Sequence, residues 1–149
     1  MFVCLGNIIR SPTCEGLLRS LVTDNVFVDS SAVTTDDIGQ HPHKHAQRVC
    51  KEHGFNISSH VSKLIRDEDF AKFDLIVSLE EYVFRCLKRM EPKNAKGKVV
   101  RFSSIDISNP WYGNKKDFDE MYSEIEKEMK TFVQKNIPCE YLKDRKSVV

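Results

Sequence analysis

Short apolar runs alternate along this chain with longer segments in which apolar residues recur at helical spacing. The short runs predict strands at residues 2–4, 26–30, 75–79 and 98–102. The run at 75–79 is almost wholly apolar, which is typical of a strand buried on both faces of a sheet.

The helical segments fill the intervals between these runs. The first has an apolar face formed by Cys14, Leu17, Leu18, Leu21 and Val22. Ser11 can cap this helix, and Pro12 suits its first turn. Further helices are predicted at 44–53, ending before Gly54, at 80–90 and at 118–133. We interpret 103–116 as a polar loop and 137–149 as a polar C-terminal tail.

Strands that alternate with helices predict an α/β fold with a parallel sheet. The chain has 149 residues and contains no internal repeat, linker or low-complexity stretch. We therefore expect residues 1–149 to form a single domain.

Charge and hydropathy narrow the choice of partners. The 23 Lys and Arg residues nearly balance the 22 Asp and Glu residues, for a formal net charge of +1, so nothing favours a nucleic-acid partner. The basic stretch 85–101 has no interleaved aromatic residues, and we interpret it as a solvated face. No apolar run is long enough for a membrane span, so we expect no membrane partner.

Cysteine usage indicates the compartment. The five cysteines occur singly, with no C-x-x-C pair, and no secretory leader is visible. This pattern predicts mostly free thiols and a cytoplasmic location. We interpret the histidine-rich stretch 41–45 as a solvated loop, and we expect no metal and no cofactor.

The candidate chemistry lies in residues 4–11, between the first strand and the first helix. Backbone N–H groups at a helix N-terminus carry partial positive charge, and Gly6 and Asn7 tolerate the left-handed backbone that turns amides inward. Such a loop is an anion nest, to which Arg10 adds a planar fork that fits a phosphate group. Cys4 lies at the floor of the predicted nest, where these groups favour a thiolate aimed at phosphorus.

The segment VCLGNIIRSP (3–12) resembles the phosphate loop of the low-molecular-weight protein tyrosine phosphatases. The resemblance continues through VDSSAV (28–33), KEHGFNISSH (51–60), DFAKFDLIVSL (69–79) and NPWYG (109–113). It covers roughly residues 1–136, and the tail extends beyond the usual family end. It implies a four-stranded parallel sheet with helices on both faces and a phosphate-binding loop between the first strand and the first helix.

The resemblance also implies metal-free hydrolysis of phosphomonoesters through a phosphocysteine. Its substrates would be phosphotyrosine proteins or small aryl phosphates, and we expect a monomer. By position, Cys4 is similar to the family nucleophile, Arg10 to the phosphate clamp and Ser11 to the hydroxyl that supports the thiolate. Leu5, Gly6, Asn7, Ile8 and Ile9 correspond to the residues that bind the phosphate.

Residues outside the loop also match family positions. Asn7 and Ser30 resemble the pair whose hydrogen bonds hold the loop in shape, and His60 resembles a histidine that supports the site. Trp111 and Tyr112 resemble the aromatic wall that stacks on the substrate ring.

The largest departure from the family is Asn109, which stands where the family has a general-acid aspartate. An amide cannot donate a proton in this way, and a positioned acid contributes about 10²–10⁴-fold to the rate. Asp106 is an alternative acid three residues earlier. Two hypotheses follow: a slowed phosphatase, or a phosphotyrosine-binding module with an intact nest and no turnover.

Three further observations bear on function. Ile9 replaces a second loop cysteine of many family members, so an oxidised Cys4 would lack an internal disulfide partner. Asp36 and Asp37 lie at the expected rim of the site, where they disfavour an anionic substrate. Arsenate reductases with a similar loop need a relay of further cysteines, and Cys86 stands alone here, so that activity is a weaker alternative.

Overall fold

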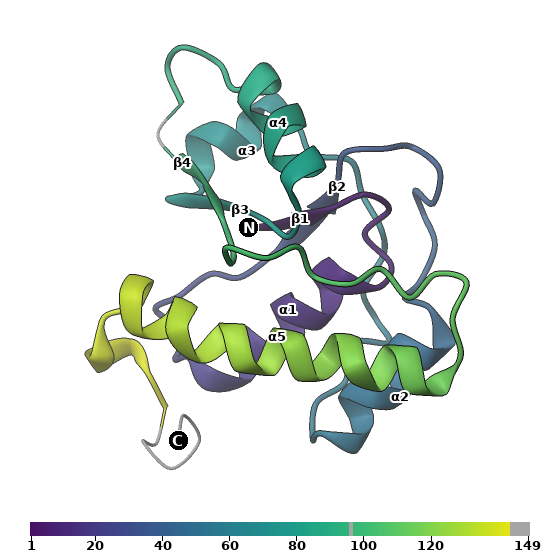
Figure 1. The fold of residues 1–149 in the computed structure, drawn as a ribbon. Helices are drawn as coiled ribbons and strands as arrows, with labels where there is room; N and C mark the ends of the chain where they lie inside the picture. Colours follow the sequence, from purple (N-terminus) through teal and green to yellow (C-terminus); the bar gives the residue numbers. More distant parts are fainter. Residues whose placement is uncertain (96, 144–149) are drawn as a thin grey trace.

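One parallel sheet runs through the computed structural model, which describes residues 1–95 and 97–143 (Figure 1). Its strands are β1 (Phe2–Cys4), β2 (Ser30–Ala32), β3 (Leu75–Ser78) and β4 (Lys98–Arg101). The strand order is β2-β1-β3-β4, and every neighbouring pair is parallel. The predicted α/β fold with a four-stranded parallel sheet is confirmed.

Helices cover both faces of this sheet, as the resemblance implied (Figure 1). One face carries α1 (Arg10–Leu21), α2 (Lys44–Glu52) and α5 (Lys115–Asn136). The other face carries α3 (Asp67–Lys72) and α4 (Glu81–Met90). A separate hydrophobic core fills each interface between sheet and helices.

The long helix α5 follows its sequence pattern closely. All seven of its predicted apolar positions are buried: Phe118, Met121, Tyr122, Ile125, Met129, Phe132 and Val133. The helix is longer at both ends than the apolar stripe. At its start, Asn114 caps the helix and Asp117 completes a reciprocal capping box.

The predicted position of the second strand was wrong. The apolar residues 26–28 precede the strand, and β2 consists of Ser30, Ser31 and Ala32, which are small and fully buried. Parallel pairing places Phe2 opposite Ser30, so the register with β1 selects the serines. The apolar side chains before the strand do not take part in the sheet, and Phe27 is 63% exposed.

Two helices differ from the prediction, one in its cap and the other in its presence. The first helix begins at Arg10, and Ser11 forms no cap, because its hydroxyl group contacts the Cys4 thiol. The short helix α3 was not predicted. Three acidic residues in its first turn and a capping interaction between Arg66 and Asp69 stabilise it.

The interpretation of residues 137–149 as a polar tail was wrong for the part that the structure describes. Ile137 and Leu142 pack against the core, and a short 3₁₀ helix, η1 (Cys139–Tyr141), lies between them. Leu142 forms an antiparallel bridge with Val22, and the Lys143 N–H donates to the Leu21 carbonyl at 2.9 Å. Residues 144–149 lie outside the described part of the chain.

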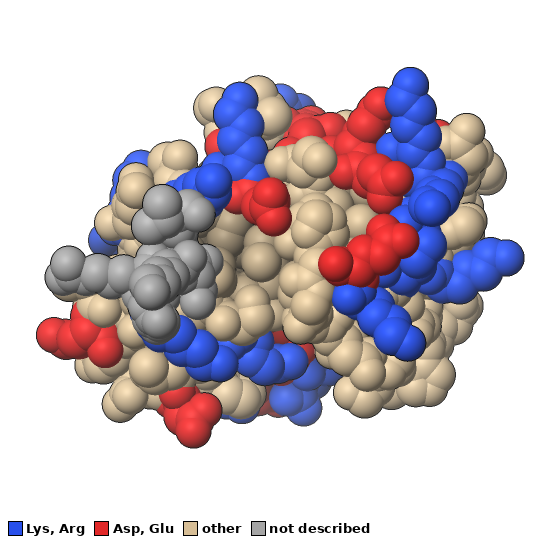
Figure 2. Space-filling model, turned by 90° about the horizontal axis from the view of Figure 1, so that it is seen from below, with Lys and Arg blue, Asp and Glu red and all other residues tan. Residues whose placement is uncertain are grey.

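Charged side chains of both signs lie on the face that Figure 2 shows, around a central area that is largely uncharged. Across residues 1–95 and 97–143, no helix combines the length and the apolar character that a membrane crossing requires.

Candidate active site

The loop that joins β1 to α1 forms the floor of an open cavity of about 410 Å³. Parallel strands end at this edge of the sheet, and ligands of α/β proteins bind at such edges. The lining comes from three stretches of chain: Cys4, Leu5, Gly6, Asn7, Ile8, Ile9 and Arg10; Thr34, Asp36 and Asp37; Asn109, Trp111 and Tyr112. The structure thus brings together the loop, the acidic rim and the aromatic residues.

Cys4 ends β1 and is 2% exposed. Its sulfur lies 2.9 Å from the Ser11 hydroxyl oxygen, and the Asn7 backbone N–H donates to the sulfur at 3.3 Å. Both groups can therefore form a hydrogen bond with the sulfur.

The loop backbone is held with its carbonyl groups turned toward the protein. Ser62 Oγ donates to the Gly6 carbonyl at 2.7 Å, and the His43 N–H donates to the Ile8 carbonyl at 2.9 Å. Thr34 Oγ1 donates to the Leu5 carbonyl at 3.0 Å.

Most backbone N–H groups of the same loop, unlike its carbonyl groups, have no hydrogen-bond partner in the described part of the chain. Within the described residues, the N–H groups of Leu5, Gly6, Ile8 and Ile9 donate no hydrogen bond. Unpaired amides that gather in one loop at a helix N-terminus provide an oxyanion site.

Asn7 lies at the centre of a hydrogen-bond network in the loop. Its side chain is fully buried, and its backbone has a left-handed conformation, with φ 60°. Its side-chain amide donates to Ser11 Oγ at 2.7 Å and to Ser30 Oγ at 3.0 Å. Its carbonyl oxygen accepts from His60 Nε2 at 2.9 Å and from the Lys63 N–H at 3.2 Å. Both donors and both lone pairs of the side chain are therefore used.

A buried carboxylate supports this network from behind. The Ser30 hydroxyl donates to Glu15 Oε1 at 2.6 Å, and His60 Nδ1 lies 3.7 Å from the same oxygen. Burial lowers the pKa of His60 below its ordinary value, although the nearby Glu15 carboxylate opposes this shift. The sequence reasoning missed Glu15, whose only signal was a carboxylate on the apolar side of α1.

Arg10, at the first position of α1, is 2% exposed and reaches the edge of the cavity. Its Nη1 donates to Glu80 Oε2 at 3.1 Å and to the Ile107 carbonyl at 3.0 Å. These contacts hold the guanidinium group in place before any anion binds. The sequence reasoning missed Glu80 as well, because nothing local links it to a residue 70 positions earlier.

The opposite wall of the cavity is aromatic and open to solvent. Trp111 is 41% exposed and Tyr112 is 97% exposed. Asn109 lies at the mouth, and its side-chain oxygen accepts from the Trp111 N–H at 3.3 Å. Asp106 is not among the lining residues, and its carboxylate accepts from Arg101 at 2.6 Å.

The histidine-rich stretch 41–45 is more ordered than a solvated loop, which corrects our interpretation. His43 Nδ1 accepts from the His45 N–H at the start of α2, and the His43 ring stacks on Phe118 with centroids 4.8 Å apart. Because His43 also contacts Ile8 through its backbone, this stretch supports the loop. Burial lowers the pKa of His43.

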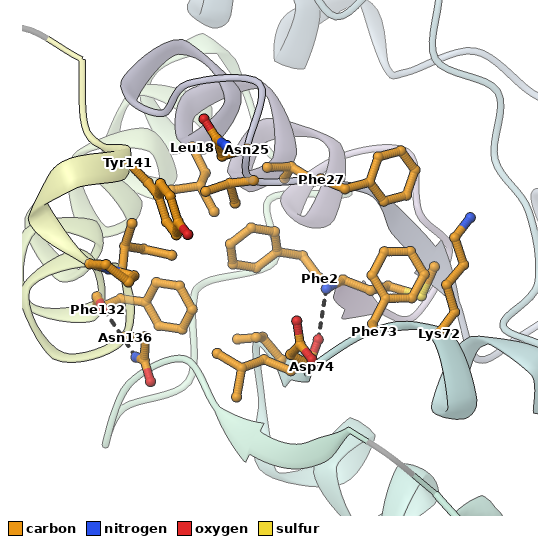
Figure 3. A pocket seen from close by; sticks show the side chains of 17 residues that line it. Phe2, Leu18, Asn25, Phe27, Lys72, Phe73, Asp74, Phe132, Asn136 and Tyr141 are labelled. Atoms are coloured by element: carbon orange, nitrogen blue, oxygen red, sulfur yellow. Dashed lines mark hydrogen bonds between the residues drawn. The ribbon is translucent and has the colours of Figure 1, made fainter.

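A larger cavity, of about 510 Å³, lies at the other edge of the sheet. Figure 3 shows the side chains that line it, which include Phe2, Phe27, Phe132 and Tyr141. None of its lining residues also lines the cavity above Cys4. No cysteine is among the described residues that line it.

Comparison with known proteins identifies the family. The family model described as "Low molecular weight phosphotyrosine protein phosphatase" matches residues 1–145. The chain belongs to this family. The match extends past residue 136, so the family resemblance reaches further than the sequence analysis predicted.

Individual relatives agree over most of their length. The low molecular weight phosphotyrosine protein phosphatase of Homo sapiens is 39% identical in an alignment 148 positions long, which covers 91% of this chain and 93% of that protein. A solved low molecular weight protein tyrosine phosphatase from Streptococcus pyogenes superposes with a TM-score of 0.84 at 30% identity, over 93% of each chain. Wzb of Vibrio vulnificus, solved in complex with benzylphosphonate, gives 0.82 at 28% identity, over 90% of this chain and 95% of that one.

Proposed function

We propose that this protein is a phosphotyrosine protein phosphatase that forms a phosphocysteine on Cys4, with an acid step weakened by Asn109. The observation that carries the proposal is the Cys4 sulfur at the floor of a cavity that is also lined by Arg10 and by a loop with four unpaired amides. Phosphotyrosine proteins or small aryl phosphates are the substrates that this site and this family support.

Binding comes first in the mechanism. The amides of Leu5, Gly6, Ile8 and Ile9, together with the Arg10 guanidinium, would hold the three outer oxygens of the phosphate group. The substrate ring would lie against Trp111 and Tyr112. In this arrangement phosphorus would lie above the Cys4 sulfur, in line with the bond that must break.

Two displacements then complete the reaction. The Cys4 thiolate attacks phosphorus, an S–P bond forms, and the substrate oxygen departs with the electrons of the broken P–O bond. Water then attacks the phosphocysteine, which releases phosphate and returns the electrons of the S–P bond to sulfur. The Ser11 hydroxyl, 2.9 Å from that sulfur, would stabilise the departing thiolate. No step requires a metal or a redox cofactor.

The first displacement is the step that Asn109 weakens. A tyrosine leaving group with a pKa of about 10 needs a proton as it departs, and the Asn109 amide provides none. Asp106 is a poor substitute, because it lies outside the cavity lining and is paired with Arg101. An activated aryl ester depends much less on protonation and would be hydrolysed more readily.

The second candidate function is a phosphotyrosine-binding module without turnover. The absence of a general acid at Asn109 favours this candidate. An arsenate reductase fits less well, since Cys14 and Cys50 are buried and Cys86 lies apart on α4. Burial raises the pKa of the Cys14 and Cys50 thiols, which makes them poor nucleophiles for a relay.

The test is hydrolysis of an activated aryl phosphate and of a phosphotyrosine peptide by wild type, Cys4→Ser and Asn109→Asp. We expect wild type to hydrolyse the ester, Cys4→Ser to be inactive, and Asn109→Asp to speed peptide hydrolysis by about 10²-fold or more. Asp106→Asn is the matched control and should leave both rates unchanged.

Two outcomes would contradict the proposal. If wild type and Asn109→Asp were both inactive while phosphate still bound, the protein would be a binding module. If Asp106→Asn alone lowered peptide hydrolysis, the missing acid would be Asp106.

A further inference from the structure

We infer that Asp36 and Asp37 make this protein select phosphotyrosine substrates whose neighbouring residues are basic. The inference rests on the proposed function, since it concerns the substrate of the same site. It gives a role to two carboxylates that line the cavity yet take no part in holding the loop.

The lining of the cavity carries negative charge near its mouth. Asp36 and Asp37 are the acidic residues among the lining side chains, and Arg10 is the cationic one. Arg10 lies deep in the cavity, 2% exposed and paired with Glu80, so it does not neutralise the rim. Over residues 1–95 and 97–143, neither aspartate forms an ion pair.

Asp37 lies next to the loop between β1 and α1. The Asp37 carboxylate lies against Gly6 of the phosphate loop so closely that a Cβ at Gly6 would overlap Asp37 Oδ2. The other oxygen of Asp37 lies 3.5 Å from Gln40 Nε2, a weak contact. The carboxylate therefore lies beside Gly6, next to the cavity. Partial burial and the adjacent Asp36 raise the pKa of Asp37, as expected for two carboxylates without a cation.

Two aromatic side chains line the same cavity as the aspartates. Trp111 and the almost fully exposed Tyr112 present ring surfaces at the same mouth. Aromatic faces attract lysine and arginine side chains. A basic residue beside the phosphotyrosine would thus meet carboxylates on one side and aromatic rings on the other.

The two aspartates also repel the phosphate group itself. That repulsion is the same for every phosphotyrosine substrate, so it cancels when two peptides are compared. Selectivity is a difference of affinities, and only the flanking charges differ between such peptides. Basic flanks gain attraction at the rim, whereas acidic flanks add repulsion.

The experiment compares two phosphotyrosine peptides of equal length, flanked on both sides by lysine or by glutamate, with para-nitrophenyl phosphate as a third substrate. At low salt we expect kcat/KM of wild type to be about 5-fold higher for the lysine peptide, or more. The Asp36→Asn/Asp37→Asn variant should bring this ratio close to one. Raising the salt to about 0.5 M should also reduce it, since screening shortens the range of exposed charges.

A control variant separates the rim from overall charge. Asp24→Asn/Glu140→Gln removes the same charge from exposed residues that do not line the cavity. It should keep the wild-type ratio. A second readout, the Kd of each peptide for Cys4→Ser, measures the same preference without turnover.

The possible outcomes are distinct. Equal values for the two peptides, or a preference that survives loss of both rim aspartates, would overturn the inference. An equal loss of activity on all three substrates in Asp36→Asn/Asp37→Asn would overturn it too, because the carboxylates would then act in the chemistry. If wild type hydrolysed nothing, the proposed function would fail, and the Kd ratio would still decide the inference.

Discussion

At the scale of single residues, the Asn7 side chain connects the loop between β1 and α1 to the rest of the protein. Asn7 combines a left-handed backbone, which asparagine tolerates better than most residues, with four side-chain hydrogen bonds. These bonds join the phosphate loop to β2 and to the segment around His60.

Replacement of Asn7 tests this role. We expect Asn7→Ala to lower the free energy of unfolding by roughly 3 kcal/mol, because several buried polar groups lose their partner and alanine is strained at positive φ. Asn7→Gly should be less destabilising than Asn7→Ala by about 1 kcal/mol, since glycine removes the strain alone. Urea denaturation of the three proteins measures both differences, and equal stability of wild type and Asn7→Ala would contradict the assignment.

Ile9 determines how the site responds to oxidation. An oxidised Cys4 has no thiol at position 9, and burial raises the pKa of Cys14, so neither position offers a thiolate to form a rescuing disulfide. We therefore expect peroxide to convert Cys4 to sulfinic and sulfonic acids, with activity that a thiol reductant does not restore.

Mass spectrometry of the peptide that contains Cys4 checks this prediction. Ile9→Cys is the matched variant and should form a reducible disulfide and recover its activity. Detection of a disulfide between Cys4 and Cys14 in wild type would show that the buried thiol can reach the site.

At the scale of elements, the helices position the site through their N-terminal ends. The first turn of α1 supplies Arg10 and Ser11, while the start of α5 fixes the end of the loop that holds Trp111. Asn114 Oδ1 accepts from the Asp117 N–H at 3.3 Å, and Asp117 Oδ2 accepts from the Asn114 N–H at 2.8 Å.

Loss of this capping box has a defined consequence. Asn114→Ala should lower the free energy of unfolding by about 1 kcal/mol, the usual contribution of an N-cap. Because the loop beside it also loosens, KM for a phosphotyrosine peptide should rise more than kcat falls. Asn114→Ser keeps a capping group and should behave like wild type, whereas equal effects of both substitutions would contradict a capping role.

The elements also show why some sequence predictions succeeded. Helix α5 was predicted because seven apolar side chains repeat at helical spacing over many turns, a signal that needs no partner. Strand β2 was placed four residues too early at its start, because its serines are buried by pairing with β1 rather than by their own hydropathy. Docking of residues 137–143 onto α1 was missed for the same reason.

At the scale of the whole molecule, folding and the site are coupled through His60. This ring links the segment that follows α2 to Asn7 of the loop and to Glu15 of α1. Its pKa in the folded protein lies below the ordinary value of 6.5, because burial disfavours the charged ring. The unfolded chain therefore binds more protons than the folded protein at mildly acidic pH.

The sign of the pH dependence follows from this difference. The contribution of His60 to stability is complete above pH 6.5 and falls as the pH drops through that value toward the lowered pKa. Urea midpoints at pH 7.5 and 5.5 should show a larger loss for wild type than for His60→Gln, which keeps a donor for Asn7 and does not titrate. Equal losses would contradict the prediction.

The sequence by itself determined what is local. Residues 3–12 specify the strand, the loop and the helix start within one contiguous stretch, so the thiol, the amides and the arginine could be assigned a common site. The alternation of apolar runs and helical segments likewise determined the α/β class, because both periodicities come from neighbouring residues.

The tertiary structure alone decided what depends on distant contacts. Arg10 bonds to a carbonyl 97 residues away at Ile107 and to Glu80, 70 residues away, and Glu15 accepts from Ser30 of β2. The fold also pairs Asp106 with Arg101, outside the lining of the cavity. Such pairings have no periodic signal, because they arise only when the sheet and its two helical layers bring remote segments together.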